Sequence, residues 1–226
     1  MRSRTIQPKP QLRAFFFHEP FEQNFWADIL EEVYKKQVYL RFLPKKTTGT
    51  VCVDWGANVG LTAYYFSRYF ERVLAVEPSQ LHRESLTSMI KQNELKNVTV
   101  APYAISNKNG KTKFYHNENQ TMFMLESFGK TEDFEEVDTI TVDSLFEKYN
   151  LDHIDLLKFD IEGAECEVIN SEGFKKWAPK IQVIAGEWHE WAKCSKENFQ
   201  HTLEGLGYKF RWRHDTKASV FEAERV

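Results

Sequence analysis

The chain has 226 residues, of which 42% are hydrophobic and 28% charged, and its formal net charge is −3 at pH 7. This length is enough for one α/β domain with a full core. The slightly negative balance excludes a general attraction to nucleic acid or to an anionic membrane surface, and because the sequence contains no run of about 18 apolar residues, no transmembrane helix is expected.

The three cysteines, Cys52, Cys166 and Cys194, are widely spaced and include no C-x-x-C pair. Their odd number and their spacing predict reduced thiols in a cytoplasmic protein and argue against a structural zinc site. Cys52 lies within a predicted buried strand, so we interpret it as a small core residue.

The first 45 residues differ in composition from the rest of the chain. Residues 1–18 contain four basic residues and no acid, which is typical of a flexible basic arm, and their prolines disfavour the helix of a transit peptide. Over residues 26–36 apolar side chains recur at helical spacing and predict an amphipathic helix, which either covers the core or forms a lid over the substrate. We therefore expect residues 1–45 to pack on a main domain formed by residues 46–226.

Residues 51–61 carry the pattern of a strand, a glycine turn and a helix. A short apolar run predicts a buried parallel strand, and Asp54 closes it. Gly56 and Gly60 allow a tight turn and a close approach of the backbone to a bound molecule. The free N–H groups of a helix beginning at Leu61 and running to residue 70 point into the same space. This turn therefore predicts a cofactor site.

Two classes of cofactor use such a turn. A dinucleotide site needs three glycines in the order G-x-G-x-x-G, whereas this chain has G-A-N-V-G. A second predicted strand, residues 73–77, ends in Glu77 about 20 residues further on, where a carboxylate accepts hydrogen bonds from both ribose hydroxyls in either class. The spacing D-x-G-x-x-x-G resembles the first motif of S-adenosylmethionine-dependent methyltransferases, so we expect that cofactor and keep a nicotinamide-dependent oxidoreductase as the alternative.

The middle of the chain alternates between predicted helices and strands. The predicted elements are a helix over residues 78–93, a strand over 97–100, a hairpin strand over 111–115 and a strand followed by a helix over 137–149. Asp143 is expected to cap the last of these helices. Residues 117–136 are polar and lack a clear period, so they predict a long loop that faces the substrate.

A cluster of acids follows the next predicted strand, which we expect to be the central strand of the sheet. Asp160 comes directly after this strand, and because ligands of open α/β sheets bind beyond the carboxyl ends of the strands, it is expected to face the same crevice as Asp54 and Glu77. We interpret Glu162 and Glu165 as the N-terminus of a helix, where the dipole favours acids.

Residues 181–189 predict the following strand, and its end falls at the same edge of the sheet as Asp160. Glu187 and His189, two residues apart, share a face. The usual pKa of histidine suits a general base near neutral pH, with Glu187 or Asp160 orienting it or holding a substrate hydroxyl. These three side chains also suit Mg²⁺ or Mn²⁺, as in catechol-type O-methyltransferases, which the chain resembles only in fold. We expect the reaction without a metal.

The last predicted elements are a helix from Ser195 to Leu206 and two strands over residues 208–212 and 218–222, in which polar and apolar residues alternate.

Four motifs of the sequence together carry a specific resemblance to a known family. The sequences V-D-x-G-A-N-x-G, V-E-P, T-V-D-S-L and D-L-L-K-F-D-I-E-G-A-E resemble the FkbM family of S-adenosylmethionine-dependent methyltransferases over about residues 50–190. Trp55 departs from the family, which commonly has a smaller residue there, and is expected to pack under the turn.

The resemblance implies a Rossmann-like α/β fold, with a seven-stranded, mostly parallel sheet, a C-terminal antiparallel hairpin and helices on both faces. It also implies O-methylation of a hydroxyl on a sugar, glycan or other small-molecule acceptor. The implied cofactor-binding residues are Asp54, Gly56, Asn58, Gly60, Leu61, Glu77, Pro78, Ala104 and Asp160, and the catalytic candidates are Asp160, Glu187 and His189. A module that binds S-adenosylmethionine without turnover remains a further alternative.

Overall fold

The computed structural model describes residue 39 and residues 49–116, 123–124, 133–213 and 219–226. The predicted basic arm, the predicted amphipathic helix and most of the predicted loop over residues 117–136 lie outside these ranges, so those expectations are not tested. Within the described part of the chain, no helix is long and apolar enough to cross a membrane.

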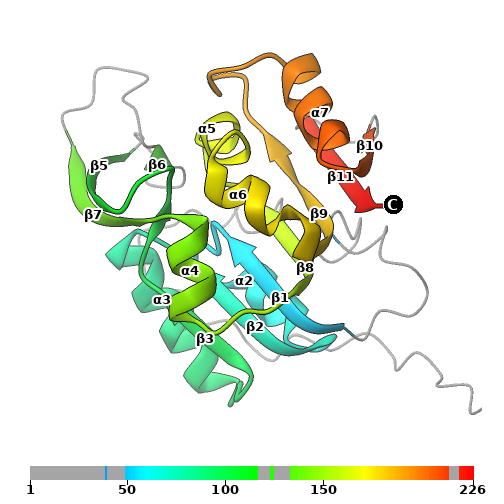
Figure 1. Ribbon diagram of the computed structural model, residues 1–226. Helices are drawn as coiled ribbons and strands as arrows, with labels where there is room; N and C mark the ends of the chain where they lie inside the picture. Colours follow the sequence, from blue (N-terminus) through cyan, green and yellow to red (C-terminus); the bar gives the residue numbers. More distant parts are fainter. Residues whose placement is uncertain (1–38, 40–48, 117–122, 125–132, 214–218) are drawn as a thin grey trace, which may run out of the picture.

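A seven-stranded sheet forms the centre of the molecule, with the strand order β10-β11-β9-β8-β1-β2-β3 (Figure 1). The strands are β1 (Gly49–Trp55), β2 (Phe70–Val76), β3 (Val98–Ala101), β8 (Ile154–Phe159), β9 (Ile181–Trp188), β10 (Tyr208–Trp212) and β11 (Ser219–Arg225). Only β11 runs antiparallel to its neighbours, between β9 and β10, and the remaining pairs are parallel. The predicted mostly parallel sheet with a C-terminal hairpin is therefore confirmed.

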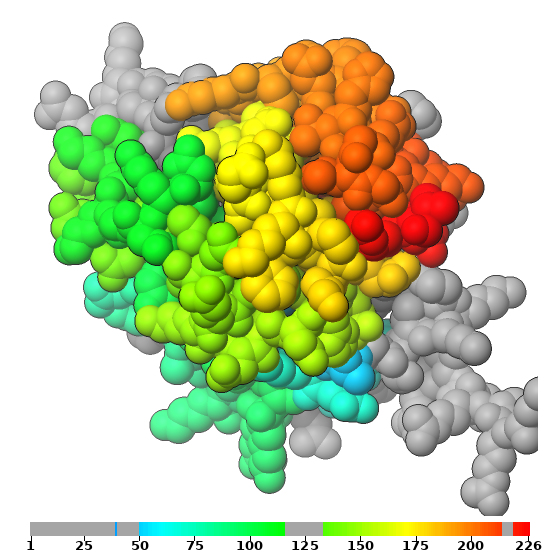
Figure 2. Space-filling view, viewed as in Figure 1, coloured from blue at the N-terminus to red at the C-terminus, as the bar shows by residue number. Residues whose placement is uncertain are grey.

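Helices cover both faces of this sheet. Helices α2 (Leu61–Phe66) and α3 (Gln80–Gln92) pack on one face, together with side chains such as Cys52 and Leu156. Helices α4 (Val142–Lys148), α5 (Glu165–Ile169), α6 (Glu172–Trp177) and α7 (Lys196–Gly205) pack on the other face, and a short 3₁₀ helix, η2 (Ala178–Lys180), follows α6. Figure 2 shows this second face, where the yellow segment containing α5 and α6 lies between the green second sheet and the orange helix α7.

The apolar periodicity explains these two layers. Strands β1 and β8 lie in the middle of the sheet and are buried on both faces, which is why they contain nearly continuous apolar runs. Trp55 is fully buried and packs against Phe159 of β8 with a centroid distance of 5.1 Å and against Phe174 of α6, so it lies in the core between the sheet and α6.

Several element boundaries differ from the predicted ones. Helix α2 ends at Phe66 and β2 begins at Phe70, so the predicted helix to residue 70 is too long. The N-cap of α4 is Thr141, whose hydroxyl accepts a hydrogen bond from the Ser144 N–H, so the prediction that Asp143 caps this helix is wrong. Asp143 lies in the first turn and accepts hydrogen bonds from Lys176 and Trp177 instead.

A second, four-stranded sheet was not expected from the sequence. It has the order β4-β7-β5-β6, with β4 (Ala104–Ile105), β5 (Gly110–His116), β6 (Phe123–Met124) and β7 (Phe134–Ile140). Strand β6 and the start of β7 fall within residues 117–136, so that segment is not a continuous loop. Both short strand segments owe their structure to pairing with β5, a contact that local periodicity does not report.

A disulfide joins Cys166 of α5 to Cys194, which lies between β9 and α7. The expectation of three reduced thiols is therefore wrong for two of them, whereas Cys52 is free and fully buried, as predicted. Sequence spacing gave no sign of the pair, because the two residues are 28 positions apart and meet only when the chain returns from β9 to pack on α5.

Candidate functional site

The glycine turn after β1 is fixed to two neighbouring strands. The N–H groups of Gly56 and Ala57 both donate to the carbonyl oxygen of Val76 at 3.0 Å, which holds the turn against the end of β2. Gly56 has φ +76°, and a Cβ at this position would lie 1.9 Å from the carbonyl oxygen of Asp160. A glycine is therefore required here by the close approach of the chain that follows β8.

Gly60 closes the turn for a different reason. Its φ is +96°, and a Cβ there would lie 2.5 Å from Cδ1 of Leu86 and 2.6 Å from Cε of Met89. This glycine therefore lets α3 pack closely against the start of α2. Between the two glycines, Asn58 also has a left-handed backbone, with φ +50°, and Leu61 begins α2 as a buried residue.

Glu77 ties the turn to the end of β2. Its carboxylate is buried, with Oε2 accepting a hydrogen bond from the N–H of Asn58 at 2.7 Å and Oε1 accepting one from Ser79 at 2.9 Å. His82 of α3 lies on the same side, with Nδ1 3.5 Å from Oε1. Pro78 is buried beside it. The predicted ribose acid therefore also sets the shape of the glycine turn, because it binds the backbone of that turn directly.

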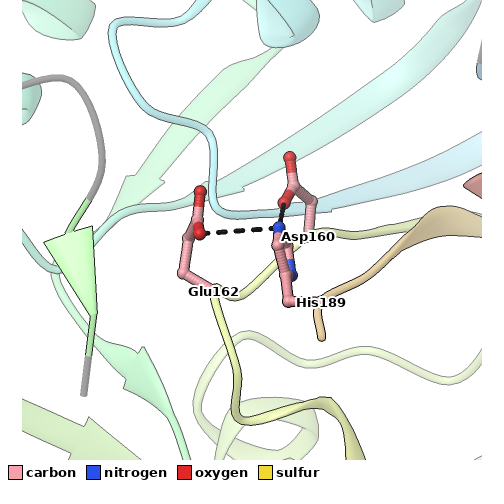
Figure 3. A group of neighbouring side chains, drawn as sticks. All are labelled: Asp160, Glu162 and His189. Atoms are coloured by element: carbon pink, nitrogen blue, oxygen red, sulfur yellow. Dashed lines mark ion pairs between the residues drawn. The ribbon is translucent and has the colours of Figure 1, made fainter. Parts of the chain in front are cut away.

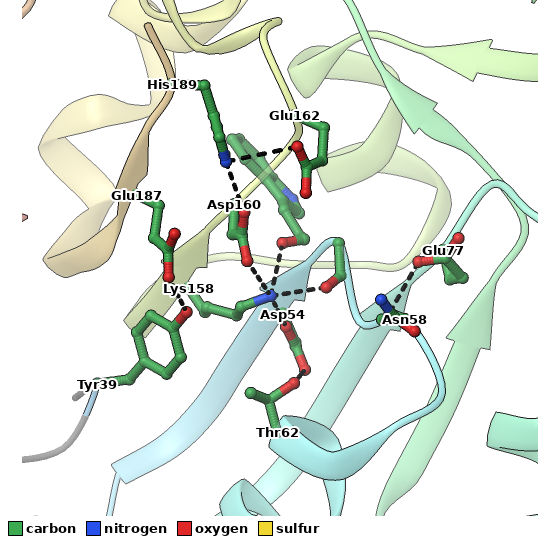
Figure 4. Close-up of polar contacts among 12 residues, drawn as sticks. Tyr39, Asp54, Asn58, Thr62, Glu77, Lys158, Asp160, Glu162, Glu187 and His189 are labelled. Carbon is green, nitrogen blue, oxygen red and sulfur yellow. Dashed lines mark hydrogen bonds and ion pairs between the residues drawn. The ribbon is translucent and has the colours of Figure 1, made fainter. Parts of the chain in front are cut away.

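Lys158 lies at the centre of the site, although no sequence pattern predicts a role for it. Its ammonium donates to the carbonyl oxygen of Gly56 at 2.6 Å and lies 3.4 Å from Asp54 Oδ1 and 3.3 Å from Asp160 Oδ2 (Figure 4). The side chain is almost fully buried on the central strand. A lysine between Leu157 and Phe159 in the central strand is a signal in the sequence, because a buried charge needs paired partners.

The charges in this group depend on one another. Burial disfavours the charged form of Lys158, but the carboxylates of Asp160 and Asp54 outweigh it and raise the lysine pKa above its usual value. Burial raises the pKa of Asp54, while Lys158 and the hydroxyl of Thr62, which donates to Oδ2 at 2.6 Å, oppose that rise. Lys158 is therefore a cation that holds two acids and the glycine turn together.

Asp160, Glu162 and His189 form a second group beside this one (Figure 3). Nε2 of His189 lies 3.7 Å from Asp160 Oδ1 and 3.5 Å from Glu162 Oε2. The other ring nitrogen, Nδ1, lies 2.7 Å from Oε1 of Glu165, which is fully buried as the first residue of α5. The structure therefore brings together His189 and Asp160, as expected, and adds two acids that had been interpreted only as a helix N-terminus.

The surroundings of His189 change its protonation. Burial lowers its pKa, but the hydrogen bond with Glu165 and the charges of Glu162 and Asp160 outweigh burial and raise the pKa to about 10. Burial raises the pKa of Glu162 to about 8. The carboxylates around His189 therefore favour its protonated form, whereas the predicted role as a general base depends on a pKa near neutral.

Glu187 and Ala104 lie in other surroundings. Oε1 of Glu187 accepts a hydrogen bond from the hydroxyl of Tyr39 at 3.1 Å, and the Tyr39 ring lies 5.7 Å from the Lys158 ammonium. Glu165, rather than Glu187, makes the close contact that orients His189. Ala104 is buried in the small core of the second sheet, with Phe114 and Val137.

Comparison with known proteins identifies a protein family that shares the sequence pattern of this site. A profile of the methyltransferase FkbM domain matches residues 54–210. A methyltransferase FkbM from Methylobacillus flagellatus KT is 18% identical with a TM-score of 0.57, and the match covers 89% of this chain and 52% of that one, so this chain spans about half of its length. No curated protein matches the chain.

Two further solved structures share the fold. A putative methyltransferase from Streptococcus mutans, solved in complex with SAH, is 12% identical with a TM-score of 0.52, and the match covers 93% of this chain and 100% of that one. An rRNA methylase from Streptococcus thermophilus is 11% identical with a TM-score of 0.50, over 89% of this chain and 95% of that one. Since the family profile spans more than half of the sequence and includes the glycine turn and the acids after β8, the chain belongs to the FkbM family of S-adenosylmethionine-dependent methyltransferases.

Proposed function

We propose that this protein transfers the methyl group of S-adenosylmethionine to a hydroxyl of a sugar, glycan or other small molecule. The observation that carries the proposal is the convergence of Asp54, Glu77 and Asp160, from the ends of three parallel strands, on one glycine turn. This convergence lies at the carboxyl edge of the sheet, where open α/β sheets bind their ligands.

The chemistry of these side chains fits the cofactor. Each oxygen of Glu77 accepts one backbone hydrogen bond, which leaves lone pairs for ribose hydroxyls. Asp54 Oδ1 lies 3.4 Å from the Lys158 ammonium, which also binds the glycine turn, so Asp54 supports the methionine side of the site through Lys158. We assign the remaining contacts by motif. The methionine part faces Gly56, Asn58, Gly60 and Leu61, the ribose faces Glu77 and Pro78, and the adenine faces Ala104.

Bound S-adenosylmethionine supplies an activated methyl group on a sulfonium, so the protein has only to place an acceptor oxygen in line with that methyl and to remove its proton. Asp160 suits this position because its side chain is 22% exposed, whereas Asp54 is fully buried. Glu187 and His189 flank Asp160 from the end of β9, and we assign them to holding the acceptor hydroxyl.

Calorimetric titration of the purified protein with S-adenosylmethionine, and separately with NAD, tests the cofactor. We expect binding of S-adenosylmethionine alone, and at least about tenfold weaker binding in Glu77→Gln, because an amide offers one oxygen in place of two. Glu71→Gln is the matched control, since Glu71 lies exposed on the same strand. Binding of NAD instead would support the oxidoreductase alternative.

A screen of acceptors then tests the reaction. Transfer of a labelled methyl group from S-adenosylmethionine to a panel of sugars, glycans and hydroxylated small molecules is expected to give a product whose methyl is bound through oxygen, identified by mass spectrometry and NMR. Tight cofactor binding with no transfer to any acceptor class, or transfer to nitrogen or carbon, would contradict O-methylation.

A further inference from the structure

The group formed by Asp160, Glu162 and His189 has the spacing of a cation site. One oxygen of each acid and one nitrogen of the histidine lie within 4.8 Å of one another, and the three side chains come from the turn after β8 and from the end of β9 (Figure 3). The group contains two oxygen donors and one imidazole, which is a ligand set that Mn²⁺ and Mg²⁺ accept.

The donor atoms face one another at ion-pair distances that are longer than hydrogen bonds. The His189 side chain is 91% buried, being 9% exposed, yet its Nε2 lies 3.5 Å and 3.7 Å from the two carboxylates, which is longer than an ordinary hydrogen bond of about 2.7–3.2 Å. Glu162 Oε2 is buried and, within the described part of the chain, has no hydrogen-bond partner. A buried carboxylate oxygen without a hydrogen bond therefore points toward the imidazole nitrogen and leaves bonding capacity for a further group.

Glu165 prepares His189 for this role. Its carboxylate is fully buried and binds Nδ1 at 2.7 Å, which places a proton on Nδ1 and leaves the Nε2 lone pair for a cation once the Nε2 proton is displaced. A histidine that binds a metal almost always donates its second ring N–H to such a partner, which fixes the ring orientation.

The backbone also directs Glu162 toward the group. Glu162 has φ +53°, and Gly163 follows with φ +103°. A Cβ on Gly163 would lie 2.6 Å from Cδ1 of Trp191, and the Trp191 ring packs on His189 with a centroid distance of 4.8 Å. A left-handed conformation is costly for a glutamate, and such conformations persist mostly at functional sites.

We infer that Asp160 Oδ1, Glu162 Oε2 and His189 Nε2 bind one divalent cation of the Mn²⁺ or Mg²⁺ class, oriented by Glu165. In an octahedral site with metal–ligand bonds of about 2.1 Å, adjacent ligand atoms are about 3 Å apart and opposite ones about 4.2 Å. Nε2 of His189, at 3.5 Å and 3.7 Å from the two carboxylates, therefore needs to approach each of them by about 0.5–0.7 Å, and the two carboxylate oxygens lie within 4.8 Å of each other. The set predicted from the sequence included Glu187 in place of Glu162, and this inference departs from the expectation of a reaction without metal.

The role of this cation rests on the proposed O-methylation. Three protein ligands leave open coordination positions, and a divalent cation lowers the pKa of a hydroxyl bound at one of them. The acceptor class that fits is a molecule with two neighbouring hydroxyls, as in a sugar, because both oxygens can occupy adjacent open positions.

Titration of the full chain with Mn²⁺ in the absence of any cofactor tests the site directly, with the electron paramagnetic resonance signal of free Mn²⁺ as the readout. We expect one bound Mn²⁺ per chain, displaced by excess Mg²⁺. Removal of a ligand in Glu162→Gln or His189→Gln is expected to abolish measurable binding, and Glu165→Gln to weaken it by about 10- to 100-fold. Glu190→Gln is the control, because Glu190 is exposed next to His189.

Circular dichroism and thermal unfolding show whether each variant is folded. If a variant fails to fold, the Mn²⁺ titration of the wild type still tests the site. Absence of Mn²⁺ and Mg²⁺ binding to the wild type at millimolar concentration, or equal loss of binding in Glu190→Gln, would overturn the site. A protein that binds S-adenosylmethionine but no Mn²⁺ would contradict this inference and leave the proposed function standing. Binding of Mn²⁺ without binding of S-adenosylmethionine would support the cation site and contradict the proposed function.

Discussion

The ammonium of Lys158 lies 2.6 Å from the carbonyl oxygen of Gly56 and so joins the central strand to the glycine turn. The same ammonium is the counter-charge of Asp54 and Asp160, which lie on either side of it (Figure 4). Lys158 is therefore a positioning residue, because it holds in place both the turn and the acid that we assign to the acceptor.

Replacement of Lys158 by methionine keeps the length of the side chain and removes its charge. Because two acids are then left buried without their cation, we expect a loss of about 3–5 kcal/mol in the free energy of unfolding, measured by urea denaturation. Lys209→Met, on the exposed side of β10, is the control and is expected to leave stability unchanged. Equal stability of the two variants would contradict the central role of the Lys158 charge.

Gly56→Ala tests the close approach between the glycine turn and the chain after β8. The added Cβ would meet the carbonyl oxygen of Asp160 at 1.9 Å in a left-handed backbone, so we expect a destabilisation of at least about 2 kcal/mol and weaker cofactor binding. Gly205→Ala is the matched control at the end of α7, where a Cβ meets no atom within 4 Å. This change is expected to stabilise the protein by about 0.5–1 kcal/mol, as alanine favours a helix.

Stability should fall with rising pH because of Glu222. Burial raises its pKa from 4.5 to about 7, while Arg211, 3.7 Å away, opposes the rise. Between these two pH values the folded state keeps the Glu222 proton, whereas the unfolded chain has lost it. The stability associated with protonated Glu222 is therefore fully present below about pH 4.5 and is lost as the pH rises to about 7.

Glu222→Gln removes this dependence, since glutamine stays neutral. We expect the variant to be more stable than the wild type by roughly 1–3 kcal/mol at pH 8 and to have similar stability at low pH, as measured by urea unfolding across that range. Glu71→Gln, at an exposed position of β2, should follow the wild-type profile. A constant difference between Glu222→Gln and wild type at all pH values would show that the pKa of Glu222 is not raised.

The disulfide between Cys166 and Cys194 gives a further prediction. It closes a loop over a separation of 28 residues, and its removal in Cys166→Ser/Cys194→Ser is expected to cost about 2–4 kcal/mol. Dithiothreitol should destabilise the wild type and leave the double variant unaffected. Without reductant, a maleimide should label only Cys52 in the denatured wild type, and labelling of all three cysteines would contradict the disulfide.

Much of the fold could be predicted because it depends on local patterns. Each of these patterns is set by a single strand or turn: the apolar runs of β1 and β8, the glycines at 56 and 60, and the alternation of polar and apolar residues in β10 and β11. The second sheet could not be predicted, since β6 and β4 are two residues long and exist only through pairing with strands distant in the sequence.

The sequence by itself determined the order of the strands along the chain, the glycine turn and the acids at the strand ends, because each of these follows from spacing along the chain. Only the tertiary structure decided that Glu165 and Glu162, rather than Glu187, surround His189, and that Lys158 joins Asp54 to Asp160. The physical reason is that pKa values, ion pairs and the disulfide depend on burial and on distances between side chains from different elements, which no local pattern encodes.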